Sequence, residues 1–374
     1  MSYKYSFTLS IAFILYALTG CNSETSSSTE ISIIKLEKFE TIISIEDNVL
    51  ATPTLIRFGS NSNLFVNDDA RTKVLEVDSN GNIVNEFGQP GRGPGELLLV
   101  NNFFLTDNHL YIVDYLQYFI HKYDYNGQFI SSMDYGNKLG LPNAPPAPFS
   151  ASQILVKDIT NQPFITQDGN VMLSAVKFSD SVQSIYELTD WDGYHIIDIG
   201  SVPEGSTFVI DNDKLRSDVS NRVVPSLYRS NAFVIHNRAN SDEYFLIYSA
   251  LPKISKYNSS GQKLWSTEIP QTMELDSLTT RFFETMDQLQ QRGRTSRIDL
   301  KYYTSGVSNT DGELFLITNT VPVWIHHFST QGELIHRYKL ISEDIENMPI
   351  FDIDFDRQRI FVVTEEGDIR AYPF

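Results

Sequence analysis

The chain has 374 residues, a formal net charge of −18 and a single cysteine, Cys21. The acidic balance excludes nucleic acid as an expected partner, because phosphate backbones repel a negatively charged surface, and it disfavours direct binding to anionic lipid headgroups. A single cysteine excludes a disulfide within the chain and a metal site built from cysteines.

The first residues have the pattern of an export signal. Lys4 precedes an apolar run over residues 7–18 that only Thr8 and Ser10 interrupt. The run is shorter than the roughly 20 apolar residues that a membrane-spanning helix needs. Its length matches the apolar region of a signal peptide that is removed on export. We therefore predict that residues 1–20 are a signal peptide.

The apolar run ends in Leu18-Thr19-Gly20-Cys21, which resembles the lipobox of bacterial lipoproteins. The resemblance implies that Cys21 is diacylated and becomes the new N-terminus, which anchors the protein without a spanning helix. An ordinary cleaved signal followed by a chance cysteine is the alternative. Residues 21–30 are polar and rich in Ser and Thr, so we predict a flexible tether. Asn22, in place of Asp, gives no reason for inner-membrane retention, so we expect an exported protein at the outer membrane or cell surface.

One unit recurs along the rest of the chain. It consists of a short apolar strand, a turn, a second strand, a glycine turn and a third strand. A tight hairpin turn requires a positive φ, which glycine adopts without steric cost. The turn glycines of five copies are Gly81, Gly127, Gly193, Gly261 and Gly332. A propeller blade of four short strands takes about 40 to 50 residues, so the longer intervals contain insertions.

The sixth copy, over residues 360–372, stops before its fourth strand. A strand-like segment near the mature N-terminus, residues 40–45, can supply that strand and close the ring. Closure removes exposed sheet edges, which otherwise invite aggregation. The sequence thus predicts an all-β fold, a six-bladed β-propeller over residues 31–374. Five or seven blades remain alternatives, because an insertion can be mistaken for part of a blade.

A glycine-rich phrase after the first copy carries a family resemblance. Residues 87–97 read FGQPGRGPGEL and follow the segments 66–68 and 78–81 of the first copy. Together they resemble the secreted six-bladed β-propeller lipoproteins related to NHL-repeat propellers, closely over residues 40–130 and more loosely over 131–374. The resemblance implies a fold and export but no single activity. The phrase lacks the Gly-Lys-Ser/Thr ending of a phosphate-binding loop, so we interpret it as a rigid crossing between blades.

Long connections follow four of the predicted blades, over residues 88–96, 134–163, 200–231 and 268–301. In a propeller all such connections emerge on one face, and loops on a rigid scaffold commonly carry binding sites. Within the last of them, residues 275–290 predict a helix whose apolar side packs on the propeller. Residues 141–148 predict an extended, proline-rich segment.

The favoured function is an envelope-anchored binding module whose ligand, a protein or a glycan, contacts this loop-elaborated face. Arg and Tyr are good interface anchors. The candidate ligand-binding residues on that face are Arg92, Arg222, Tyr228 and Arg229. Apart from the membrane, which the lipid anchor reaches, no other partner is predicted.

The alternative is a metal-dependent hydrolase or lyase with its site in the central channel, where Arg57, His236 and Asp352 are the candidate residues. The propeller resemblance implies this alternative, because six-bladed propellers include calcium-dependent lactonases and metal-dependent lyases. A calcium site needs six to eight oxygen ligands, whereas the predicted inner strands offer two acidic candidates. No nucleophile elbow or HExxH motif occurs. We therefore expect no catalytic residue and no cofactor, with calcium as the one metal to test.

Replacing Cys21 with Ser should release the protein from membranes, because the thioether that carries the lipid can no longer form. Fractionation of cells into soluble and membrane pools, followed by immunoblotting, measures this. A Cys21→Ser variant that stays in the membrane pool would refute lipid anchoring at this residue.

Overall fold

The computed structural model describes residues 31–138, 162–175, 182–208, 211–292, 298, 300–342, 344–345 and 350–374. Residues from Ser32 onward form one compact unit. The predicted signal peptide, Cys21, the tether and the proline-rich segment over 141–148 lie outside the described residues. In the described part of the chain, no helix is both long and apolar enough to cross a membrane.

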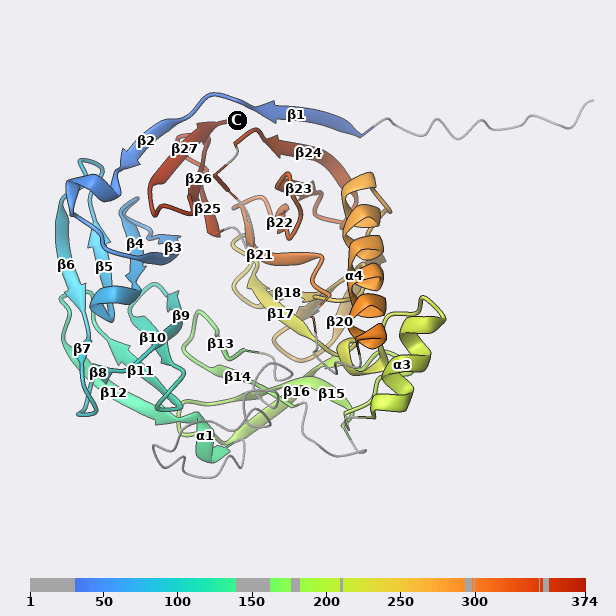
Figure 1. Ribbon diagram of the computed structural model, residues 1–374. Helices are drawn as coiled ribbons and strands as arrows, with labels where there is room; N and C mark the ends of the chain where they lie inside the picture. The colour runs from blue at the N-terminus through green and yellow to red at the C-terminus, as the bar shows by residue number, and fades with distance from the viewer. Residues whose placement is uncertain are drawn as a thin grey trace, which may run out of the picture. The chain divides into compact units, whose positions relative to one another are not determined.

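Six antiparallel sheets stand around a central axis, each with its first strand innermost (Figure 1). Blade 1 contains β3 (Pro53–Phe58), β4 (Leu64–Asp68), β5 (Lys73–Val77) and β6 (Ile83–Phe87). Blade 2 contains β9 (Val100–Leu105), β10 (Leu110–Asp114), β11 (Phe119–Tyr123) and β12 (Phe129–Asp134). Blade 3 contains β13 (Phe164–Ile165), β14 (Val171–Ser174), β15 (Ser184–Thr189) and β16 (His195–Ser201).

The remaining blades repeat the same order. Blade 4 contains β17 (Ala232–His236), β18 (Glu243–Tyr248), β19 (Lys253–Asn258) and β20 (Lys263–Glu268). Blade 5 contains β21 (Tyr303–Ser308), β22 (Leu314–Thr318), β23 (Trp324–Phe328) and β24 (Leu334–Leu340). Blade 6 contains β25 (Ile350–Asp354), β26 (Arg359–Val363), β27 (Ile369–Pro373) and β2 (Glu40–Ile43). The fold is the predicted six-bladed β-propeller.

The position of a strand within its blade explains its side-chain pattern. The second strands β10 and β22 are buried at every position, because they lie between neighbouring blades and need apolar side chains on both faces. The outermost strand β6 instead alternates partly buried with exposed residues, and Val84 is exposed. The short apolar runs of the sequence are therefore inner strands, and the alternating runs are outer ones.

Two N-terminal strands join the ring. β2 pairs antiparallel with β27, with Thr41 opposite Arg370 and Ile43 opposite Ile369, which confirms the predicted closure of the sixth blade. β1 (Ser32–Leu36) adds a fifth, parallel strand to blade 5 along β24. The sequence analysis did not predict β1, because its isolated apolar residues gave no repeat signal.

Aspartates at the ends of two second strands hold the connections between blades. The carboxylate of Asp68 accepts hydrogen bonds from the backbone N–H groups of Ala51 and Thr52, at 2.8 and 3.0 Å. Asp114 does the same for the N–H of Leu98 at 2.6 Å. Hydrogen bonds to a charged acceptor are stronger than neutral ones, so each aspartate fixes the chain as it enters its blade.

Because the strands of a blade alternate in direction, the ring has two different faces. The turns between first and second strands and between third and fourth strands lie on one face, which we call the turn face. The five glycines predicted in the third-to-fourth turns all have φ between 74° and 83°. The connections between blades lie on the other face, which we call the connection face.

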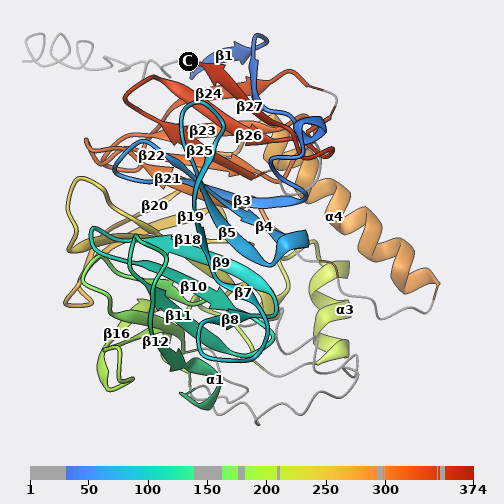
Figure 2. The ribbon, with the colours of Figure 1, turned by 90° about the vertical axis from the view of Figure 1, so that its left-hand side faces the viewer.

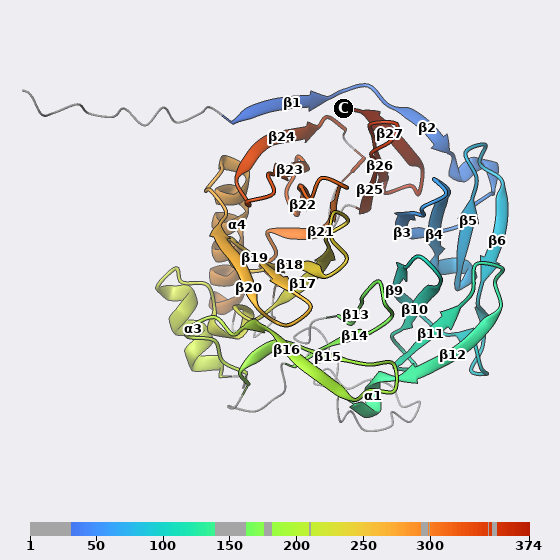
Figure 3. The same ribbon diagram turned by 180° about the vertical axis from the view of Figure 1, so that it is seen from behind.

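The helices lie on the connection face (Figure 2). They are α1 (Tyr135–Lys138), α3 (Asn212–Ser220) and α4 (Met273–Gln291), with the short 3-10 segments η1 (Ile45–Asp47), η2 (Asp69–Arg71) and η3 (Ser226–Tyr228). From behind, in Figure 3, the strands and turns stand in front of α4. α4 buries Leu275, Leu278, Phe282, Phe283 and Met286, which confirms the predicted helix and its packing side.

Ile43→Ala should lower the free energy of unfolding by about 2 to 5 kcal/mol, the range for removing a buried Ile side chain, because Ile43 is 3% exposed in the closing strand. Thr41→Ala, on the exposed side of the same strand, should change it by less than about 0.5 kcal/mol. Denaturant titration measures both. Equal effects of the two substitutions would contradict closure through β2.

Candidate functional site

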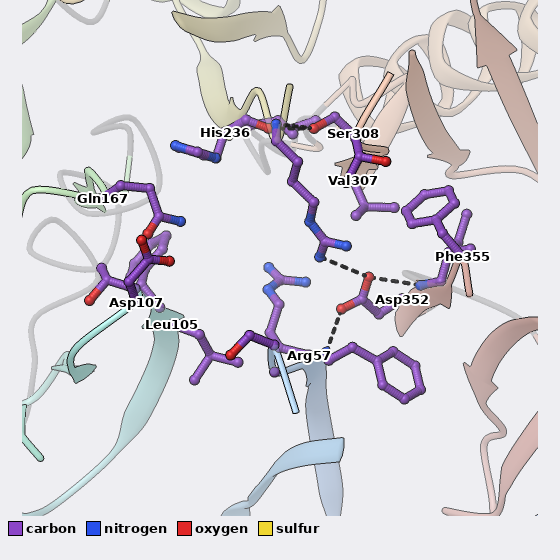
Figure 4. Close-up of a pocket in the computed structure, with 18 of the residues that line it drawn as sticks. Arg57, Leu105, Asp107, Gln167, His236, Val307, Ser308, Asp352 and Phe355 are labelled. Atoms are coloured by element: carbon purple, nitrogen blue, oxygen red, sulfur yellow. Dashed lines mark hydrogen bonds and ion pairs between the residues drawn. The ribbon is translucent and has the colours of Figure 1, made fainter. Parts of the chain in front are cut away.

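A cavity of about 540 Å³ lies where the central channel opens on the turn face (Figure 4). Six inner strands cannot fill the centre of the ring, so the channel stays open. Every blade contributes the same position to its lining, the residue two places after the end of the first strand. These residues are Ser60, Asp107, Gln167, Arg238, Thr310 and Asp356. The volume falls in the range of about 300 to 1,000 Å³ that is typical of small-molecule sites.

Asp352 lies at the centre of the cationic side of this cavity. Its buried carboxylate accepts hydrogen bonds from the backbone N–H of Phe58 at 2.8 Å and of Ile353 at 2.7 Å. The Nη2 atom of Arg238 lies 3.9 Å from its Oδ1. The carboxylate of Asp352 is therefore already hydrogen-bonded within the protein, and its negative charge lies close to the positive charge of Arg238.

Arg57, near the end of β3, points into the cavity (Figure 4). The one hydrogen bond that its guanidinium makes within the described residues is a long one, 3.4 Å from Nη1 to the carbonyl oxygen of Ile56. Burial lowers the pKa of Arg57; the carboxylate of Asp352 opposes this shift, and the charge of Arg238 adds to it. A guanidinium has five N–H donors, so most of the donors of Arg57 have no acceptor among the described residues.

The opposite side of the cavity carries Asp107, Gln167 and His236 (Figure 4). Both ring nitrogens of His236 and the Oε1 atom of Gln167 are buried and make no hydrogen bond in the described structure. Burial, aided by the charge of Arg238, lowers the pKa of His236 to about 4, against smaller opposing effects of the Ser241 backbone and Asp107. At neutral pH the ring is uncharged, with one nitrogen as donor and one as acceptor.

Aromatic side chains also line the cavity. They are Phe58, Phe104, Tyr125, Phe164 and Phe355. The rings of Phe104 and Phe164 pack edge to face with centroids 5.3 Å apart, and the guanidinium of Arg238 lies 5.8 Å from the ring of Phe355. The cavity thus combines polar groups with aromatic surface, the composition of a small-molecule site.

The three channel residues predicted from the sequence, Arg57, His236 and Asp352, line this one cavity. The sequence analysis missed Asp107, Gln167 and Arg238, because they lie in turns just past the strands that it considered. Their common spacing from the first strand is the signal that could have found them.

The connection-face candidates lie elsewhere, and three of them make contacts within the protein. Arg222 bonds Asp287 of α4 at 2.6 Å. Tyr228 is buried against Phe282 of α4, with ring centroids 6.3 Å apart. Arg229 donates hydrogen bonds to backbone carbonyl oxygens of the same connection. These residues hold α3 and α4 in place, and a ligand on this face stays a prediction.

Arg92 is exposed in the glycine-rich crossing. The concave backbone beside it is filled by the Glu96 carboxylate, which accepts a hydrogen bond from the Gly93 N–H at 2.6 Å. A Cβ atom on Gly91 would overlap that carboxylate. The Glu96 carboxylate therefore lies where a bound phosphate would have to lie, which agrees with a rigid connection between blades.

Comparisons with known proteins give one sequence family and several solved structures that resemble this chain. A sequence family described as "6-bladed beta-propeller" matches residues 13–137. The solved structure of a Bacteroides fragilis protein, for which export has been inferred, shares 15% sequence identity with this chain at a TM-score of 0.53. The match covers 91% of this chain and 98% of the Bacteroides fragilis chain. Virginiamycin B lyase of Staphylococcus aureus shares 11% identity at a TM-score of 0.45, covering 90% and 88%. No curated protein matches the sequence.

The calcium alternative stays a prediction. In the part of the chain that the structure describes, no group of three or more His, Cys, Asp or Glu side chains could hold a metal ion. Of the two acidic inner-strand candidates, Asp352 is bonded as described above, and Asp354 pairs with Arg357 at 3.1 Å.

Stability should depend on pH through His236. Its pKa is about 4 in the folded protein and about 6.5 when unfolded, so the unfolded state binds more protons between these values. The free energy of unfolding should therefore fall as the pH drops from 6.5 to 4, by up to about 3 kcal/mol for this residue. Denaturation across this range should give a shallower fall for His236→Gln than for the wild type. His195→Gln, on the exposed strand β16, is the control, and equal slopes for both variants would contradict the assignment.

Proposed function

We propose that the protein is a binding module of the cell envelope, held there by a lipid on Cys21, and that its central cavity binds a small ligand with an anionic group. The observation that carries the proposal is Arg57, a cavity-facing guanidinium whose donors mostly lack acceptors in the part of the chain that the structure describes. A cation removed from bulk water is costly unless it is paired. A ligand carboxylate or phosphate supplies the missing partner.

The arrangement of Arg57 and Arg238 supports an anion rather than a neutral ligand. Two guanidinium groups lie close to the carboxylate of Asp352, which already accepts two backbone N–H groups, so guanidinium donors are left to meet a ligand. Guanidinium groups bind carboxylates and phosphates through paired, charge-assisted hydrogen bonds. Asp352 is held by two backbone N–H groups and can orient Arg238 while leaving its outer donors to the ligand.

The charge of the whole protein limits what can enter. At a formal net charge of −18, the chain repels large polyanions over distances up to the Debye length, about 8 Å at physiological ionic strength. A small anion within the cavity can contact the arginines directly through charge-assisted hydrogen bonds. This balance favours a small organic acid or phosphate over an anionic polymer.

The envelope location rests on the sequence pattern around Cys21. The apolar run, the lipobox-like ending and the polar residues 21–30 agree with one another, and the described residues contain no spanning helix that would compete as an anchor. The alternative function, a metal-dependent hydrolase or lyase, has no comparable support among the described residues.

Arg57→Gln should weaken binding of an anionic ligand about 10- to 150-fold, because a hydrogen bond to a charged group contributes about 1.5 to 3 kcal/mol. Titration calorimetry of the full-length chain with succinate, inorganic phosphate and the dipeptide glycyl-phenylalanine provides the measurement. Arg57→Lys keeps the charge but loses the fork geometry, so it should fall between the wild type and Arg57→Gln.

Arg92→Gln tests the opposite face in the same assay. The proposal predicts that this substitution leaves the affinity unchanged, since Arg92 lies on the connection face. Loss of binding in Arg92→Gln with full binding in Arg57→Gln would move the site to that face. Failure of every anion in the panel to bind at millimolar concentration would contradict the proposal.

A further inference from the structure

The two sides of the central cavity offer different groups to a ligand: both arginines lie with Asp352, Asp354 and Asp356 of blade 6 on one side, and the other side has carboxylate and amide acceptors. Arg57 and Arg238 are the arginines of the lining, which contains no lysine among the described residues. Asp107 lies on the other side with Gln167 (Figure 4). Asp107 is exposed and makes no hydrogen bond or ion pair with any described residue. One end of the cavity thus has unused cationic donors, and the other has an unused carboxylate.

The hydrogen-bond acceptors near Asp107 lack donors among the described residues. The Oε1 atom of Gln167 is a buried acceptor without a partner, and neutral His236 adds a further acceptor nitrogen. A buried polar atom left unpaired costs about 1 to 3 kcal/mol. An ammonium group has three N–H donors and no acceptor, and its positive charge is complementary to the negative charge of Asp107. A carboxylate ligand alone would leave all of these acceptors unpaired.

We propose that the ligand is a zwitterion, a free amino acid or a short peptide, with its carboxylate on Arg57 and Arg238 and its ammonium group on Asp107 and Gln167. This inference rests on the proposed function and names its ligand class. The aromatic lining residues Phe104, Phe164 and Phe355 offer apolar contacts to the side chain of the ligand, and the cavity volume accommodates a dipeptide.

A sugar acid is the competing chemistry, because its hydroxyl groups can donate to the same acceptors. Two features favour the ammonium group. Hydroxyl groups leave the charge of Asp107 uncompensated in a strongly acidic protein, whereas an ammonium group neutralises it. The apolar wall also offers few partners for the remaining hydroxyl groups of a sugar.

The experiment is a calorimetric titration of the full-length chain with four matched probes. Glycyl-phenylalanine carries both charges, N-acetyl-glycyl-phenylalanine lacks the ammonium group, glycyl-phenylalanine amide lacks the carboxylate, and glucuronate is the sugar acid. Glycyl-phenylalanine should bind at least about tenfold more tightly than each of the other three, since each lost charged hydrogen bond contributes 1.4 kcal/mol or more, about a factor of ten.

Two variants assign the ends of the ligand. Asp107→Asn should weaken the binding of glycyl-phenylalanine at least about tenfold and leave the affinity for the N-acetylated probe unchanged. Arg57→Gln should weaken both probes. Asp311→Asn is the matched control, because it removes a negative charge from an exposed first-to-second turn of blade 5 outside the cavity lining. Thermal unfolding of each variant checks that the propeller is intact.

The outcomes separate this inference from the function on which it rests. Equal binding of glycyl-phenylalanine and its N-acetylated form, with loss of both in Arg57→Gln, overturns the zwitterion and keeps the anion site. Tighter binding of glucuronate than of the dipeptide also overturns the zwitterion. Binding of the dipeptide that is unaffected by Arg57→Gln overturns the anion site as well, and no binding of the dipeptide overturns the inference.

Discussion

The pairing of β2 with β27 is the constraint on which the rest of the structure depends. The last blade has four strands only because it takes its fourth from residues that precede the first blade in the sequence. The pairing brings the inner strands β25 and β3 side by side. As a result, Asp352 of blade 6 can bind the backbone of Phe58 in blade 1. The candidate site is therefore assembled across the closure.

The two faces of the ring differ in structure because the strands of each blade alternate in direction. The long segments lie on the connection face. Polar side chains there hold these segments in place, as Arg222 does through its ion pair with Asp287 of α4. The turn face has short turns, so side chains two residues beyond the inner strands reach the channel without being covered. Arg222, Tyr228 and Arg229 on the connection face make contacts within the protein, whereas Arg57, Gln167 and His236 at the channel mouth keep polar atoms without a partner in the described residues.

The sequence predicted the blade count, the closing strand and α4 correctly, because each depends on a local pattern. Glycine turns mark blades, and a run of apolar residues at helical spacing marks α4. Arg57, His236 and Asp352 were also placed in the channel, because they lie in predicted inner strands. The convergence of Asp107, Gln167 and Arg238 was not predictable in this way, since three turns of unequal length meet only after the ring closes. The burial of Tyr228 was likewise not predictable, because nothing local reveals that α4 covers it.

The central claim is that the cavity on the turn face binds an anionic group between Arg57 and Arg238. A crystal structure of the full-length protein with glycyl-phenylalanine tests it most directly, because it locates the ligand without relying on substitutions. The account predicts density in the cavity, with the carboxylate oxygens within about 3 Å of both guanidinium groups. Ligand density on the connection face, with only water beside Arg57, would contradict it.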